Sequence, residues 1–211
     1  MKTMSRDISL LVLIGLLLTG CSFATVRTIE EDRIAKEGFS ATGYVAGVWE
    51  SEFLPVLQDE ATEITDLLEQ IDDDEDAAIE QFGNRTSTGP YSFMARGEAQ
   101  LIGVDRESRV GLAALDLSPY DGEVDIFLAI GPVLRGNALR DAAGIFEFND
   151  FTNQVEFAQV SDALKERADE EVLQQTDIDS LVGETIRFLG AFTLDDRDEI
   201  VIMPVALEVI E

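Results

Sequence analysis

The chain has 211 residues, of which 43 are acidic and 15 basic, so its formal net charge is −28 at pH 7. Apolar residues make up 45% and charged residues 27%, a balance that indicates a folded protein with a sizeable core and excludes a disordered chain. The acidic excess excludes nucleic acid as a partner, because such binding needs basic side chains that neutralise phosphates. Saline surroundings and a cationic partner are both open as explanations of the excess.

The chain contains no histidine and a single cysteine, Cys21. Catalysis by Ser-His-Asp or Cys-His groups and metal sites built on histidine are therefore excluded. We predict that the protein is not an enzyme and uses no metal and no other cofactor. A hydrolase that uses two carboxylates is the remaining catalytic alternative, but a chain with 43 acids always contains some suitably spaced pair.

Residues 1–20 have the features of a secretory signal peptide. Basic Lys2 and Arg6 precede an apolar run over 8–18, which is too short for a membrane-spanning helix. The stretch Leu-Thr-Gly-Cys at 18–21 resembles a bacterial lipobox, which implies cleavage before Cys21 and acylation of that cysteine. Several acyl chains anchor a protein stably, so we predict a lipid anchor on the periplasmic face of a bacterial membrane, with Ser22 favouring the outer membrane. The alternative is a soluble secreted protein with a free thiol.

Residues 21–40 are predicted to be the lipidated cysteine and a polar tether, and residues 41–90 a helical region. Ser40 is a suitable N-cap for a first helix, and Pro55 is expected to end or kink it. The buried stripe of that helix consists of apolar residues at helical spacing: Tyr44, Val45, Val48, Trp49 and Phe53. A second helix carries an apolar face made of Ile64, Leu67, Leu68 and Ile71. The acidic run over 72–76 is interpreted as a solvated turn or a helix N-terminus.

From residue 91 the apolar period changes from helical to alternating. Five main strands are predicted, over 91–105, 110–117, 124–130, 184–194 and 199–210, with a further short strand over 144–148. Val124, Ile126, Leu128 and Ile130 are expected to share one face, and so are the odd-numbered residues from 201 to 209. Pro204 must lie at an edge or a bulge. A helix over 149–173 separates the third and fourth main strands, with Asn153 and Glu156 as a capping box.

This order of elements predicts an α+β fold. We expect a five-stranded antiparallel OB-like barrel over 91–211, with an N-terminal helical hairpin and one helix between the third and fourth main strands. A twisted open sheet with helices on one face is the alternative.

The loop over 131–144, GPVLRGNALRDAAG, carries two arginines in a strongly acidic chain. Arg135 and Arg140 either pair with nearby acids such as Asp141 and tie the loop to the barrel, or present donors to sugar hydroxyls, a carboxylate or a phosphate. We expect Arg140 and Asp141 to form a structural pair and Arg135 to be the better binding candidate. The full set of candidate binding residues is Arg135, Asn137, Arg140, Asp141, Asn153 and Gln154.

The same region carries several short motifs. They are Gly131-Pro132, Arg140-Asp141, Phe148, Phe151, Asn153 and Gln154. In these residues the chain resembles a family of predicted periplasmic lipoproteins, whose members are often encoded beside ribose-type sugar ABC transporters. The resemblance implies a context of sugar uptake, with the transporter or its binding protein as a partner.

We therefore predict a non-catalytic periplasmic lipoprotein that is an accessory or scaffold to a sugar ABC uptake system or to the cell envelope. Its contact with the membrane would be through the N-terminal lipid. The alternative is a module that binds a small ligand, a sugar or an anionic metabolite, through the loop over 131–144. A concave pocket with convergent polar groups near Arg135 would favour that alternative.

Overall fold

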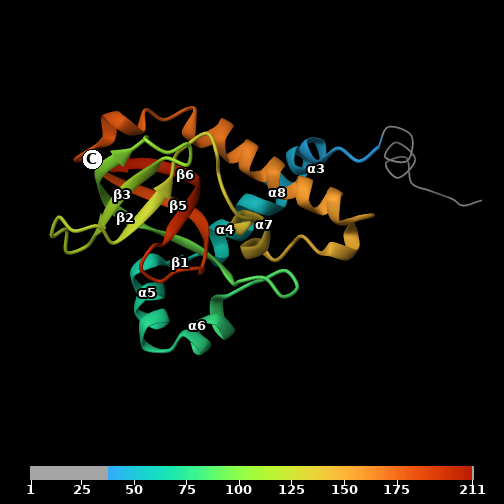
Figure 1. Cartoon of the computed structure of the whole chain (residues 1–211), viewed down its shortest axis with the longest axis horizontal. Coiled ribbons are helices and arrows are strands. Elements are labelled where there is room, and N and C mark those ends of the chain that lie inside the picture. Colours follow the sequence, from blue (N-terminus) through green and yellow to red (C-terminus); the bar gives the residue numbers. More distant parts are fainter. Residues whose placement is uncertain (1–37, 211) are drawn as a thin grey trace, which may run out of the picture. The chain divides into compact units, whose positions relative to one another are not determined.

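The computed structural model describes residues 38–210. The predicted signal peptide 1–20, the lipidation site Cys21 and the tether up to residue 37 lie outside the described residues. Within 38–210, no helix is long and apolar enough to cross a membrane. From Ser40 onward the described residues pack into one unit, in which helices surround a small barrel (Figure 1).

The first helical segment begins at the predicted cap. Ser40 Oγ accepts a hydrogen bond of 3.2 Å from the backbone N–H of Gly43 and starts α3 (Ala41–Val48). The chain then stays helical through a π-helical turn (Trp49–Phe53) and α4 (Leu54–Glu60). Pro55 therefore does not end the helical segment, and the π-helical turn directly before it is where the segment departs from regular α-helix.

The next two helices are α5 (Ile64–Asp73) and α6 (Glu75–Phe82), and they meet in the acidic run. The carboxylate of Asp74 accepts a hydrogen bond of 3.1 Å from the N–H of Ala77 and caps α6. Glu75 and Asp76 occupy the first turn of α6, where the helix dipole favours negative charge. The second half of the acidic run is therefore the N-terminus of α6, one of the two predicted settings, whereas Asp72 and Asp73 end α5.

All five predicted main strands are present, and each is shorter than predicted. They are β2 (Ser92–Asp105), β3 (Leu112–Leu117), β4 (Ile126–Ala129), β5 (Thr185–Thr193) and β6 (Val201–Ile210). They pair in the ring β2–β3–β4–β6–β5, which returns to β2. A sixth strand, β1 (Thr62–Glu63), pairs with β2.

The prediction of a purely antiparallel, five-stranded barrel is wrong in two respects. A ring with an odd number of strands cannot alternate in direction all the way round, and β4 and β6 are indeed parallel. They pair only at Phe127 with Val201 and at Leu128 with Ile202, so the ring is narrowly joined there. The strand β1, also parallel to its partner, is too short to show any alternation in the sequence.

The segment between β4 and β5 holds more helix than predicted. The loop over 131–144 contains α7 (Ala138–Ala143), and the predicted strand over 144–148 is wrong, because Gly144 turns the chain at φ 66° toward a 3₁₀ turn over 148–150. The long helix is α8 (Gln154–Ala168), followed by a π-helical turn over 169–173. Asn153 Oδ1 caps α8 by accepting from the N–H groups of Val155 and Glu156. The Glu156 carboxylate accepts from Thr152 rather than from Asn153, which shifts the capping box by one residue.

A bulge in β6 changes which residues face the core. Leu189 is opposite Ala206 whereas Gly190 is opposite Pro204, so Pro204 lies beside a bulge, as predicted. A one-residue insertion reverses the two faces of a strand. Ile202 packs in the barrel core before the bulge and Leu207 packs against that core after it, so the prediction of a single face of odd-numbered residues is wrong.

The barrel core is closed at one end by α5. Its buried residues Ile64, Leu67 and Ile71 pack with inward-facing strand residues such as Phe93 and Phe188. Figure 1 shows α5 and α6 beneath the strands, while α3, α7 and α8 lie to one side of them. Ile126, Leu128 and Ile130 are buried, whereas Val124 lies before the start of β4 and is 47% exposed, so the predicted shared face does not extend to Val124. The β2–β3, β4–α7 and β5–β6 connections come together at another edge of the barrel, and this edge is polar.

Candidate functional site

A cavity of about 400 Å³ lies where the β2–β3, β4–α7 and β5–β6 connections meet. We call it the Arg135 cavity. Its polar and charged lining is Ser108, Arg135, Thr193, Asp195, Asp196 and Glu199. Its apolar lining includes Val110, Leu112, Val201 and Met203.

Two glycines allow the connections that form this cavity to approach each other. Gly111 has a φ of 60°, and a Cβ added to Gly131 would lie 2.0 Å from the carbonyl oxygen of Val110. The N–H of Ile130 donates to the Gly111 carbonyl at 3.1 Å, and the N–H of Val133 donates to the Arg109 carbonyl at 3.2 Å. The β2–β3 and β4–α7 connections are therefore held together by backbone bonds in a space that excludes a side chain at Gly131.

Arg135 is exposed and carries a free positive charge. Within residues 38–210 its guanidinium makes no hydrogen bond and no ion pair, although Asp195, Asp196 and Glu199 line the same cavity. Arg109 is the other such arginine in this range. The remaining described arginines each pair with a carboxylate or lie over an aromatic ring. In so acidic a chain, the unpaired state of Arg135 is a distinctive feature of this cavity.

A larger hollow of about 800 Å³ surrounds Arg140, Asp141 and Gln154, and we call it the Arg140 hollow. Arg140 is only 7% exposed; its Nε donates to Asp141 Oδ1 at 2.8 Å, and its Nη2 forms an ion pair with the same oxygen at 2.7 Å. Its Nη1 donates to the Phe157 carbonyl at 3.3 Å, and its guanidinium lies 3.9 Å from the centre of the Phe157 ring. Thr86 donates to the same Asp141 oxygen at 2.7 Å. These contacts tie α7 to α8 and to the loop before β2, as expected of a structural pair.

The six predicted binding residues are therefore not brought together. Arg135 lines its own cavity, whereas Arg140, Asp141 and Gln154 line the Arg140 hollow. Asn137 accepts a hydrogen bond of 2.8 Å from Ser161 and so links the start of α7 to α8. Asn153 caps α8. Asn137 and Asn153 therefore both make hydrogen bonds that support the structure of α7 and α8.

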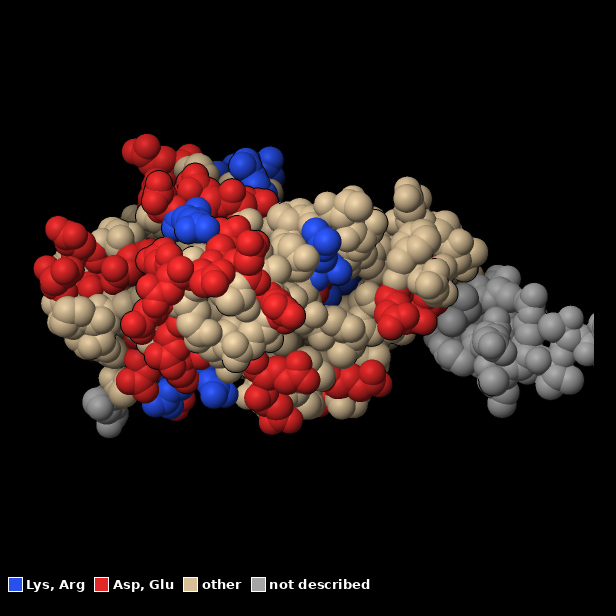
Figure 2. Space-filling view, turned by 90° about the horizontal axis from the view of Figure 1, so that it is seen from below, with Lys and Arg blue, Asp and Glu red and all other residues tan. Residues whose placement is uncertain are grey.

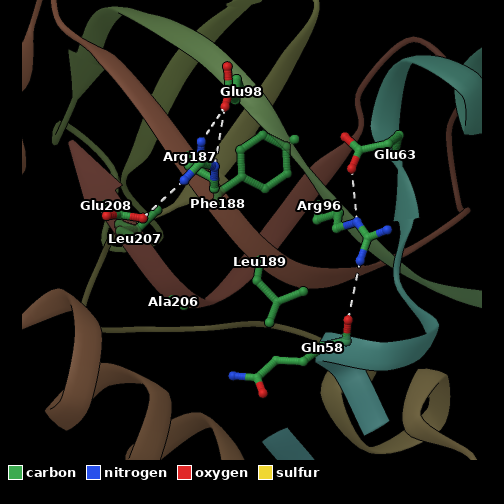
Figure 3. A pocket seen from close by; sticks show the side chains of 11 residues that line it. Gln58, Glu63, Arg96, Glu98, Arg187, Phe188, Leu189, Ala206, Leu207 and Glu208 are labelled. Atoms are coloured by element: carbon green, nitrogen blue, oxygen red, sulfur yellow. Dashed lines mark hydrogen bonds and ion pairs between the residues drawn. The ribbon is translucent and has the colours of Figure 1, made fainter. Parts of the chain in front are cut away.

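A third concave surface, which sequence reasoning missed, lies on the outside of β2, β5 and β6 and has a volume of about 290 Å³ (Figure 3). We call it the Arg187 groove. Arg187 lies between its cross-strand neighbours Glu98 and Glu208, at 2.6 and 3.2 Å. The hydrogen bond and charge of Glu98 raise the pKa of Arg187 above its ordinary value. The groove could have been found only with the strand register in hand, because its residues come from α4, β1, β2, β5 and β6, which are far apart in the sequence.

The second arginine of the groove is also neutralised. Arg96 Nε donates to Glu63 at 2.8 Å, and its Nη1 donates to the Gln58 carbonyl at 3.2 Å (Figure 3). Leu189 provides apolar surface between the two ion-pair clusters (Figure 3). Because both arginines already have carboxylate partners, the groove offers less uncompensated charge than the Arg135 cavity.

Acidic side chains outnumber basic ones on the face of the molecule seen in Figure 2. Figure 2 shows them gathered over the barrel half of the face seen from below, with a few basic side chains among them. Within residues 38–210, no group of three or more carboxylate, thiol or imidazole side chains is arranged to hold a metal ion. The Arg135 cavity offers one guanidinium, three carboxylates, two hydroxyl groups and an apolar wall.

The strand order and the cavity between the barrel loops define an OB-fold protein. A crystal structure of an OB-fold protein from Thermotoga maritima is similar to this chain, with a TM-score of 0.67 and 20% sequence identity over 82% of this chain and 99% of the other. The chain belongs to the family of predicted periplasmic lipoproteins (DUF2291), whose model matches residues 11–208. No curated protein matches the chain. The predicted family resemblance is confirmed, and membership fits the predicted lipid-anchored location in the periplasm.

Proposed function

We propose that this protein is a non-catalytic accessory lipoprotein of a membrane transport system and that it holds a small ligand in the Arg135 cavity. The observation that carries the proposal is the position of this cavity. OB-folds bind ligands beside their second and third strands, between the loops that join strands one to two and four to five. The corresponding β2–β3 and β5–β6 connections line the Arg135 cavity, together with residues of β3 and β4.

The charge of the protein favours a membrane attachment through lipid alone. A net charge of −28 would repel the protein body from an anionic bilayer surface. The family resemblance supports sugar uptake as the context, with an ABC transporter or its binding protein as the partner. Ser22 supports the outer membrane as the site of the anchor.

Two observations support a binding role over catalysis. The chain has no histidine, and acylation of Cys21 would consume its one thiol. Asp195, Asp196 and Glu199 are exposed to solvent at the rim of the cavity. A hydrolase that uses two carboxylates would instead place one of them in a deep, desolvated cleft.

The test is cross-linking of the lipidated full-length chain in its own envelope, followed by identification of the captured proteins and of co-purified small molecules. We expect a transport component, a bound metabolite or both, and loss of the metabolite in Arg135→Gln. Arg109→Gln is the matched control, because Arg109 is also exposed and unpaired within 38–210 but does not line the cavity. Recovery of neither a transport component nor a metabolite would contradict the proposal.

A further inference from the structure

The Arg135 cavity holds separated charges of opposite sign. Arg135 comes from the β4–α7 connection, and the three acids come from the β5–β6 connection across the same cavity. No carboxylate oxygen within residues 38–210 lies within 4.0 Å of the Arg135 guanidinium nitrogens. Both the positive and the negative charges are thus available to a ligand, whereas in the Arg187 groove the opposite charges already form ion pairs with each other.

The neighbouring side chains leave the acids free for such a role. Ser108 accepts from the N–H of Val110, and Thr193 shares a hydrogen bond with Ser92, so both hydroxyls have local partners. Asp196 accepts from the N–H of Asp198 within its own loop. The carboxylates of Asp195 and Glu199 make no side-chain hydrogen bond or ion pair within 38–210.

The overall field of the protein narrows the class of ligand. A ligand that carries only negative charge must approach a molecule of net charge −28, which opposes its association. A ligand that carries only positive charge would leave Arg135 without a partner. A ligand that carries both charges is neutral overall, avoids the long-range repulsion and satisfies both sides of the cavity.

We propose that the Arg135 cavity binds a small zwitterion of the amino-acid type with an apolar side chain, an inference that rests on the proposed ligand-binding function. The guanidinium of Arg135 receives the carboxylate, and the rim acids, chiefly Asp195 and Glu199, receive the ammonium group. Val110, Leu112 and Val201 provide the apolar wall for the side chain. A volume of about 400 Å³ is at the lower end of that of small-molecule pockets, which suits a ligand of this size.

The test is calorimetric titration of the full-length lipidated protein in detergent micelles. The probes are L-alanine, L-valine, L-leucine and L-methionine, with D-ribose as a neutral polyol. For the tightest amino acid, the N-acetyl derivative keeps only the negative charge and the amide derivative keeps only the positive charge. We expect the amino acid to bind at least about tenfold more tightly than either derivative, since each loses a charge-assisted hydrogen bond.

Substitutions assign each charge to its side of the cavity. Arg135→Gln should weaken binding of the amino acid at least about tenfold and leave binding of its amide derivative unchanged. Glu199→Gln with Asp195→Asn should weaken both. Arg109→Gln should change neither, and an unchanged unfolding midpoint in each variant shows that the fold is kept.

The outcomes separate this inference from the function on which it rests. If D-ribose binds and depends on Arg135 while no amino acid binds, the zwitterion is overturned and ligand binding in the cavity stands. If the N-acetyl derivative binds as tightly as the amino acid, the role of the rim acids is overturned. If no probe binds, both the zwitterion and the ligand-holding part of the proposed function are overturned.

Discussion

The Arg135 cavity and the Arg140 hollow each contain an arginine from the same short segment of the chain. In one the positive charge is unpaired, and in the other it is neutralised. Arg140 is buried, bound to Asp141 and stacked on Phe157. Arg135 is exposed and has no partner within residues 38–210. The difference comes from where the nearest acids stand in the sequence: Asp141 follows Arg140 directly, whereas the acids near Arg135 belong to a distant loop.

A third arginine site shows that tertiary structure can also neutralise a charge. Arg187 has no adjacent acid in the sequence, but the register of three strands places Glu98 and Glu208 on either side of it. An unpaired arginine in this acidic protein is thus not the result of a shortage of carboxylates. It marks a place where the fold holds the acids at a distance.

The largest expected effect is that of Arg140→Met. Removal of one partner from a buried ion pair leaves the other charge unpaired. We therefore expect the unpaired Asp141 carboxylate to lower the free energy of unfolding by about 3 kcal/mol. Urea unfolding followed through the fluorescence of Trp49, which is buried, measures the change. Arg135→Met is the control and should stay within about 0.5 kcal/mol of the parent protein. Equal losses of unfolding free energy in the two variants would contradict the distinction between a structural Arg140 and a free Arg135.

Gly131→Ala should have the next largest effect, because it targets the close approach that shapes the Arg135 cavity. The added Cβ would meet the Val110 carbonyl at 2.0 Å, and backbone must move to relieve the contact. We expect a loss of about 2 kcal/mol in the same unfolding assay, together with weakened ligand binding. Gly47→Ala is the matched control: it lies in α3 with no atom within 4 Å of the added Cβ, and alanine there should stabilise the protein by roughly 0.5–1 kcal/mol.

Much of the fold could be predicted because single elements carry strong local patterns. The alternation of apolar residues located all five main strands, and Ser40 and Asn153 located two helix starts. The short helix α7 has only six residues, too few for a period, and β1 has two. The prediction for the two faces of β6 is wrong for a different reason: Pro204 allowed either an edge or a bulge, and only the pairing with β5 shows the extra residue that reverses the faces.

Only the basic side of the candidate site, Arg135, could be predicted from the sequence. Arg135 stands out in the sequence as a cation between glycine turns in an acidic chain. Asp195, Asp196 and Glu199 do not stand out among so many acids. Their role depends on barrel closure, which brings the β5–β6 connection to the β2–β3 connection. The split between Arg135 and Arg140 likewise depends on α7, which buries Arg140 and leaves Arg135 outside it.

A smaller effect is expected for Asn153→Ala, which tests whether Asn153 stabilises the Arg140 hollow rather than binds a ligand. The Asn153 side chain accepts two N–H groups at the start of α8, the helix that carries Phe157 beneath Arg140. Loss of such a cap costs about 1 kcal/mol. Gln154→Ala is the neighbouring control, since Gln154 is exposed and makes no side-chain hydrogen bond within 38–210. A change in affinity for any ligand of the Arg135 cavity in Asn153→Ala would show that the two regions are coupled, against the separation drawn above.

The smallest effect concerns pH, and it applies to the Arg140 side alone. Tyr44 packs edge-on against Phe146, a residue of the Arg140 hollow, and burial, followed by the charges of Asp150 and Glu52, raises its pKa above the ordinary value. The folded protein therefore keeps the phenolic proton to a higher pH than the unfolded chain does. This contribution to stability is complete below about pH 10, where unfolded tyrosine is protonated, and is lost as the pH rises toward the raised folded value. Comparison of unfolding free energies with those of Tyr44→Phe between pH 8 and pH 11 measures it, at ~150 mM salt to screen surface charges. If the two proteins lose stability in parallel over that range, the phenol is not held neutral by its surroundings and the alkaline loss belongs to groups elsewhere in the molecule.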